Sequence, residues 1–123
     1  LWAPDGKRFL YQAFDPTLNS VQYRVYSLAD PRPVGEKEDY IAYEARDGGR
    51  GLATIFWYGD SRHLIIVREG KIFVKEIDGE NEMLLFSGEF DTDNIFPRPG
   101  GGGVIILTRF NEEAPLNFYL LSF

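Results

Sequence analysis

Glycine and proline interrupt this chain every few residues. Its 123 residues include 13 glycines and 7 prolines, whereas an amphipathic helix needs ten or more positions free of both, with apolar residues three and four apart. The exception is the stretch 36–46, EKEDYIAYEAR. Its good helix formers surround Tyr40, Ile41 and Tyr43, which are equally good strand residues, so a short helix and a strand both stay open there. The rest of the chain favours strands.

The apolar segments are short, rich in β-branched and aromatic side chains, and bounded by turn residues, which is typical of strands. Turns such as DPTLNS, REGK and NEEAP separate them, so neighbouring strands should pair antiparallel. LIIV at 64–67 and VIIL at 104–107 are apolar on both faces, which predicts small sheets stacked face to face. The predicted class is all-β. The expected strands are 8–14, 22–28, 52–58, 63–68, 71–77, 83–87, 94–96, 104–110 and 117–123.

One plan recurs along the chain: an aromatic residue, a polar or Gly-rich turn, and an apolar strand. It occurs in LWAPDGKRFLYQAF, IFWYGDSRHLIIVR and NIFPRPGGGGVIILTRF. Aligning Trp2, Trp57 and Phe96 gives steps of 55 and 39 residues, and the shorter step is close to the roughly 40 to 45 residues of a four-stranded propeller blade. The longer step needs an insertion. We therefore expect a single domain, residues 1–123, with approximate repeats at 1–51, 52–91 and 92–123.

The segment WAPDGKRFLY resembles the start of a repeat in the TolB-like and WD40-like β-propellers, and KIFVKEIDGENEMLLFSG is similar to the segment that follows in that family. The resemblance implies about three antiparallel propeller blades in an incomplete ring, and it slightly favours an extracytoplasmic location. Gly59-Asp60-Ser61 and Arg98-Pro99-Gly100 replace the Pro4-Asp5-Gly6 turn in the second and third repeats. The motif marks a fold and not an activity, because propellers host many unrelated functions.

Composition excludes several classes of function. Lysine and arginine number 13 against 19 aspartates and glutamates, a formal charge of −6, which argues against a nucleic-acid partner because phosphate binding calls for clustered positive charge. The chain has no cysteine, so disulfides, thiolate metal sites and thiol nucleophiles are absent. Its apolar runs fall far short of the roughly 18 residues of a membrane helix. We expect no membrane span in this chain and no cofactor.

The run from Gly59 to His63, GDSRH, resembles the Gly-x-Ser-x-Gly nucleophile elbow. However, His63 replaces the second glycine, and a strand follows where an elbow has a helix. His63 is the one histidine and lies two positions from Ser61, which is implausible geometry for a catalytic triad. We interpret the run as a hairpin turn and expect no catalytic residue in this chain.

Asp91, Asp93 and Asn94 could offer oxygen ligands to a hard cation such as calcium. The glycine and the downstream glutamate of a calcium loop are missing, so a solvated loop is the preferred interpretation. Two carboxylate pairs lie in polar connections without an apolar pocket that would raise one pKa, as a glycosidase acid requires. These pairs are Glu36 with Glu38 and Glu112 with Glu113.

Two Gly-rich stretches stand out. Residues 100–103 lack the Lys-Ser or Lys-Thr of a phosphate loop and lead into a strand, which favours a hairpin tip. Residues 47–51, flanked by Arg46 and Arg50, are an interaction loop or a linker. Neither stretch predicts a chemical activity.

The function expected from these features is a non-catalytic β-propeller scaffold or protein-interaction module that assembles with another chain or copy. Both ends fall inside a blade in the repeat plan, and the last expected strand, 117–123, is an apolar edge that invites pairing. Self-association through edge strands, for instance two copies with about six blades, or a protein partner would cover it. The alternatives are the propeller of a larger enzyme resembling prolyl-oligopeptidase-type peptidases, with catalytic residues outside this chain, and a glycan- or ion-binding propeller. The candidate interaction residues are Trp2, Phe118, Tyr119, Leu120, Leu121 and Phe123.

Overall fold

The computed structural model describes residues 1–29, 40–46 and 53–122. These residues form ten strands and no helix, so the described part of the chain has no helix that could cross a membrane. The all-β prediction is confirmed. The strands are β1 (Arg8–Asp15), β2 (Ser20–Ser27), β3 (Tyr40–Ala45), β4 (Thr54–Trp57), β5 (His63–Arg68), β6 (Lys71–Glu76), β7 (Met83–Ser87), β8 (Phe90–Pro97), β9 (Val104–Thr108) and β10 (Asn117–Leu121).

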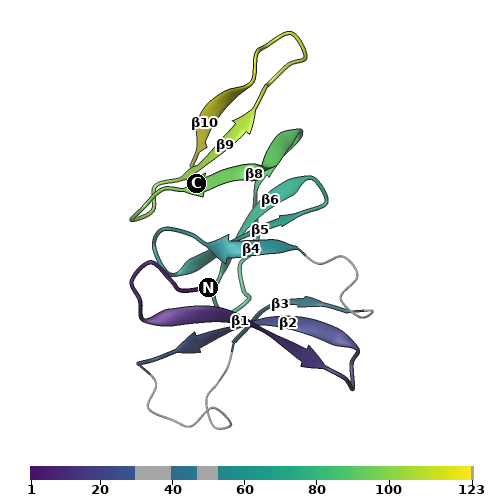
Figure 1. Ribbon diagram of the computed structural model, residues 1–123, viewed down its shortest axis with the longest axis vertical. Coiled ribbons are helices and arrows are strands. Elements are labelled where there is room, and N and C mark those ends of the chain that lie inside the picture. The colour runs from purple at the N-terminus through teal and green to yellow at the C-terminus, as the bar shows by residue number, and fades with distance from the viewer. Residues whose placement is uncertain (30–39, 47–52, 123) are drawn as a thin grey trace.

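The strands form three antiparallel sheets in chain order. Sheet 1 is β1-β2-β3, sheet 2 is β4-β5-β6-β7, and sheet 3 has the order β10-β9-β8. A bridge from Trp2 to Phe9 extends sheet 1 beyond β1. Figure 1 shows sheet 2 lying between the other two. The prediction of small antiparallel sheets stacked along the chain is therefore confirmed at this level.

The stretch 36–46, for which the sequence allows both a helix and a strand, forms a strand over residues 40–45, where β3 pairs with β2. Residues 36–39 lie outside the described residues. Ala42 is fully buried between sheets 1 and 2, and ladder bonds to β2 satisfy the backbone, so tertiary packing decides between two similar local propensities. The predicted strand 94–96 was too short, because β8 pairs with β9 on both sides of a bulge that separates Phe90 from Ile95.

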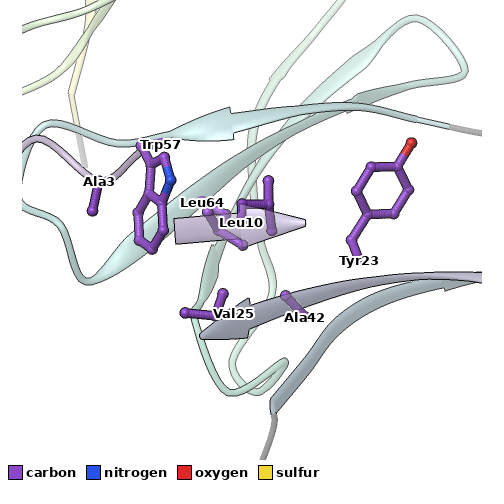
Figure 2. Packing of buried hydrophobic residues seen from close by; sticks show 7 residues of the cluster. All are labelled: Ala3, Leu10, Tyr23, Val25, Ala42, Trp57 and Leu64. Carbon is purple, nitrogen blue, oxygen red and sulfur yellow. The ribbon is translucent and has the colours of Figure 1, made fainter. Parts of the chain in front are cut away.

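Sheets 1 and 2 bury one apolar cluster between them (Figure 2). Trp57 is only 5% exposed, and its indole Nε1–H donates a 2.9 Å hydrogen bond to the Leu1 carbonyl. The Tyr23 hydroxyl donates to the Ala53 carbonyl at 3.4 Å, and burial raises the Tyr23 pKa, so this donor stays protonated. The cluster consists of Ala3, Leu10, Tyr23, Val25, Ala42, Trp57 and Leu64.

The opposite face of sheet 2 packs against sheet 3. Ile65 and Val67 of β5 meet Val104 and Ile106 of β9 in a second buried cluster. Because side chains alternate along a strand, β5 supplies Leu64 to one core and Ile65 to the other, and both are fully buried. The prediction that LIIV is covered on both faces is confirmed.

An ion pair makes the stability of sheet 2 depend on pH. The guanidinium of Arg68 donates to both carboxylate oxygens of Glu82, at 2.7 and 3.0 Å, and lies 4.0 Å over the ring of Phe73. Hydrogen bonding from Arg68 is the main cause that holds the pKa of Glu82 below its ordinary value of 4.5. A carboxyl with a lower pKa in the folded state stabilises the fold above its unfolded pKa and loses that contribution as pH falls through the folded pKa.

We therefore expect Glu82→Gln to lower the free energy of unfolding by about 1 kcal/mol at pH 7. The difference from the parent should shrink as pH falls below about 4.5. Urea denaturation at pH 7, 5 and 3 measures it. Glu80→Gln, an identical change at an exposed residue nearby, should have little effect throughout. A Glu82→Gln deficit that is the same at pH 7 and pH 3 would contradict the assignment.

Candidate functional site

We call each of the three sheets, together with its turn, one unit of the repeat. Three turns with the same hydrogen bonds lead into β1 of sheet 1, β5 of sheet 2 and β9 of sheet 3. They are turn 1 (residues 3–8), turn 2 (58–63) and turn 3 (98–103). In each, the first N–H donates to the sixth carbonyl and the fourth N–H donates to the first carbonyl, while the fourth residue has a positive φ of 70°, 61° or 95°. The first set of bonds joins Ala3 to Arg8 (2.9 Å), Tyr58 to His63 (2.9 Å) and Arg98 to Gly103 (3.0 Å), and the second joins Gly6 to Ala3 (2.9 Å), Ser61 to Tyr58 (3.2 Å) and Gly101 to Arg98 (3.1 Å).

The turns touch one another along one side of the molecule, at the left in Figure 1. The N–H of Asp5 in turn 1 donates to the Ser61 hydroxyl in turn 2 at 3.0 Å. Gly59 lies so close to turn 3 that a Cβ there would stand 1.9 Å from the Arg98 carbonyl oxygen. An open depression of about 650 Å³, lined by residues 4–5, 59–62 and 99–100, lies over them.

The polar groups of turn 2 bind their own turn or its neighbour. One carboxylate oxygen of Asp60 accepts from the N–H groups of Arg62 and His63, at 2.8 and 3.0 Å. Its other oxygen lies 2.6 Å from His63 Nδ1. Ser61 is only 4% exposed, and its oxygen is directed at Asp5. This arrangement suits a structural turn better than a nucleophile, which must be accessible to substrate.

The turns also settle the alignment of the three repeats. Counting from each turn, the residue before it is Trp2, Trp57 or Pro97, and these pair with Phe9, Leu64 and Val104. Phe96 is one position out of step, so the predicted equivalence of Phe96 with the two tryptophans is wrong. A shift of one residue moves a side chain to the other face of a sheet, and Phe96 is 49% exposed where Trp57 is buried.

Sheet 1 has an aromatic outer face, directed away from sheet 2. Leu10 of β1 faces sheet 2, so its neighbours Phe9 and Tyr11 face outward. The Phe9 ring stacks on Tyr26 at 5.1 Å and meets Trp2 edge-on at 5.3 Å. A polar border follows on the same face, where Gln22 bridges Arg24 and Glu44. We call the set Trp2, Phe9, Tyr11 and Tyr26 the sheet 1 outer face.

Sheet 3 also has an apolar outer face. Val104 and Ile106 face sheet 2, so Ile105 and Leu107 between and beyond them face outward. Cross-strand pairing puts Phe96 and Leu120 beside Ile105, and Phe118 beside Leu107. The Phe96 and Phe118 rings lie 6.3 Å apart. We call the set Phe96, Ile105, Leu107, Phe118 and Leu120 the sheet 3 outer face.

The candidate interaction residues therefore divide between several places. Trp2 lies on the sheet 1 outer face, and Phe118 and Leu120 lie on the sheet 3 outer face. Tyr119 and Leu121 point inward, where Leu121 packs on the second core and Tyr119 contacts Phe110 at 4.5 Å. Phe123 lies outside the described residues.

The sequence interpretation missed other members of the two faces. On sheet 1 these are Phe9, Tyr11 and Tyr26, and on sheet 3 they are Phe96, Ile105 and Leu107. For Phe9, Tyr11, Ile105 and Leu107, the available signal was apolar character at both alternating sets of positions in FLY and VIIL.

The acidic candidates take separate positions. Asp91 and Asp93 lie in the β8 bulge, where the Asp91 carboxylate accepts the Asp93 N–H at 2.8 Å. Glu112 and Glu113 are exposed in the β9–β10 connection, and the pair at 36 and 38 lies outside the described residues. Over residues 1–29, 40–46 and 53–122, no group of three or more potential ligands is arranged to hold a metal ion.

The stretch 47–51, which the sequence suggests as an interaction loop or a linker, lies outside the described residues. Arg46, which flanks it, pairs with Glu44 at 2.8 Å. Residues 100–103 are the last four residues of turn 3, all with positive φ. Comparisons of the chain with protein-family models, with curated proteins and with solved structures found no match.

Proposed function

We propose that this chain is a non-catalytic β-propeller segment that serves as a scaffold or protein-interaction module and assembles with another chain or copy through the two outer sheet faces. The observation that carries the proposal is the pair of apolar outer faces at the two ends of a stack of equivalent units. Exposed apolar patches of this kind mark interaction sites in soluble proteins.

The blade interpretation is supported by the repeated geometry of the turns. In sheets 2 and 3 an inner strand, the same turn and a second strand follow one another, and in sheet 1 the Trp2 bridge stands in the place of the inner strand. Face-to-face stacking of such units is the architecture of propeller blades. In this proposal Ser61 and His63 serve turn 2, and the depression over the turns has no catalytic role.

A dye that fluoresces on apolar surfaces tests whether the outer faces are available. At concentrations where the chain is dispersed, we expect the folded parent to bind bis-ANS and Phe118→Lys to bind clearly less, with an unchanged far-UV circular dichroism spectrum. Leu18→Lys is the matched control, because Leu18 is an exposed apolar residue in the β1–β2 turn, away from both outer faces. A folded chain that neither binds the dye nor associates at any concentration would contradict the proposal.

A further inference from the structure

We infer that a second copy of this chain covers both outer faces: the sheet 3 outer face of one copy packs on the sheet 1 outer face of the other, and the Trp2 indole N–H of that copy donates to the Phe96 carbonyl. This inference rests on the proposed function, for which it names the partner and the pairing of faces. Two such contacts, related by a two-fold axis, join the copies in a closed pair of six sheets.

The first step is that both contacts between the described sheets join the same two kinds of face. The turns align the second strands of the three units residue by residue. The first residue after each turn faces the preceding sheet, and the second residue after each turn faces the following sheet. This holds wherever the structure has such a neighbouring sheet. The first set is Phe9, Leu64 and Val104, and the second set is Leu10, Ile65 and Ile105.

The second step applies this rule to the ends of the stack. The sheet 1 outer face carries Phe9, which belongs to the set that meets a preceding sheet. The sheet 3 outer face carries Ile105, which belongs to the set that meets a following sheet. The two outer faces are therefore complementary to each other in the way that the buried faces are, and a second copy supplies both. Among the described sheets, no face pairs with its own kind.

The hydrogen bond follows from the same alignment. Trp57 of sheet 2 donates its indole N–H to the carbonyl of Leu1 in sheet 1. Trp2 is the equivalent of Trp57, because both stand directly before their turns. Phe96 is the equivalent of Leu1, because both stand two residues before their turns. Trp2 is 58% exposed, and a buried Trp usually finds a partner for its N–H. At the contact between copies, the Trp2 indole thus has a backbone acceptor in the position that Leu1 provides for Trp57.

A closed pair is favoured over an open array because it leaves neither apolar face in water. Joining one contact brings the other pair of faces together within the same assembly, and closed two-fold dimers are the commonest soluble oligomers. Each copy carries a formal charge of −6, so the copies repel at long range, and added salt should strengthen association by screening.

Mixing two blocked variants tests the pairing of faces. Trp2→Lys blocks the sheet 1 outer face, and Phe118→Lys blocks the sheet 3 outer face, both at exposed positions. In sedimentation velocity at micromolar concentration, we expect the parent and Leu18→Lys to be dimeric and each blocked variant alone to be monomeric. An equimolar mixture should again form a dimer, because each variant keeps the face that the other has lost. The added lysine lowers the net negative charge, so charge repulsion cannot explain a loss of association.

Labelling with 5-fluorotryptophan tests the Trp2 contact without a core substitution. The two tryptophans give two ¹⁹F signals, which Trp2→Phe assigns. On dilution through the dimer dissociation constant, the Trp2 signal should move and the Trp57 signal should stay. Trp2→Phe itself should weaken association by about tenfold for each of the two contacts of the dimer, because each contact loses one hydrogen bond and part of the aromatic contact.

The outcomes separate this inference from the proposed function. A parent that stays a monodisperse monomer at about 100 μM would overturn the second copy as partner. In that case bis-ANS binding would still support the outer faces as interaction surfaces. Blocked variants that dimerise alone would show like-with-like pairing and would overturn the pairing rule. A folded chain that neither binds the dye nor associates at any concentration would contradict the proposed function itself.

Discussion

Replacing Trp57 with alanine should lower the free energy of unfolding by about 3 to 5 kcal/mol, the usual cost of truncating a large buried aromatic. The indole is almost fully buried between sheets 1 and 2, and its loss leaves a cavity beside Leu64 and Leu10. It also removes the hydrogen bond to the Leu1 carbonyl, which ties the start of the chain to sheet 2. Urea denaturation followed by far-UV circular dichroism measures the change.

Trp2→Ala is the matched control for that experiment. The same side chain is removed from the equivalent position of the preceding unit, but there it is more than half exposed. We expect a loss below about 1 kcal/mol, since surface changes seldom cost more, provided both proteins are measured at concentrations where the copies are dissociated. A Trp57→Ala loss as small as that of Trp2→Ala would show that the contact between sheets 1 and 2 is wrong.

Gly59→Ala should lower the free energy of unfolding by about 3 kcal/mol, at the upper end for overpacking. The new methyl group would stand 1.9 Å from the Arg98 carbonyl oxygen and 2.7 Å from the Gly101 nitrogen. Both are backbone atoms of turn 3, so no side chain can rotate away and the two turns must separate. Thermal unfolding of the parent and the variant measures the loss, and the second core between sheets 2 and 3 should loosen with it.

Gly100→Ala separates crowding from backbone strain. Gly100 has a φ of +80°, yet a Cβ there meets nothing within 4 Å. Its substitution should cost only the left-handed backbone penalty of about 1 to 2 kcal/mol. If Gly59→Ala were no more costly than Gly100→Ala, the close packing of turns 2 and 3 would be excluded.

The middle strands were predictable because their signal is local. His63–Arg68 and Met83–Ser87 have the same bounds in sequence and structure, since β-branched and aromatic runs between turn residues leave few other conformations. The two-sided burial of β5 was predictable for the same reason: four consecutive apolar residues cannot all be hidden unless both faces of the strand are covered. The turn residues of the three repeats likewise marked where the chain reverses.

The alignment of the third repeat shows where local signals stop. Phe96 looked like the counterpart of Trp57 because both are large aromatics just before a turn. The actual counterpart, Pro97, has no aromatic ring, and only the hydrogen bonds of turn 3 reveal the one-residue offset. For the same reason, the β8 bulge was not predictable. The extent of β8 depends on where β9 offers a pairing partner, and not on the local sequence alone.

By itself, then, the sequence determined the class, the strand order along the chain and the positions of the turns, because these depend on backbone propensity and on side-chain alternation within a few residues. Tertiary structure decided which face of each strand is covered, since this depends on register between segments far apart. That is why Phe9 and Leu64, equivalent in their units, differ: Leu64 is buried against sheet 1, whereas Phe9 lies on the outer face of sheet 1, away from the core between sheets 1 and 2.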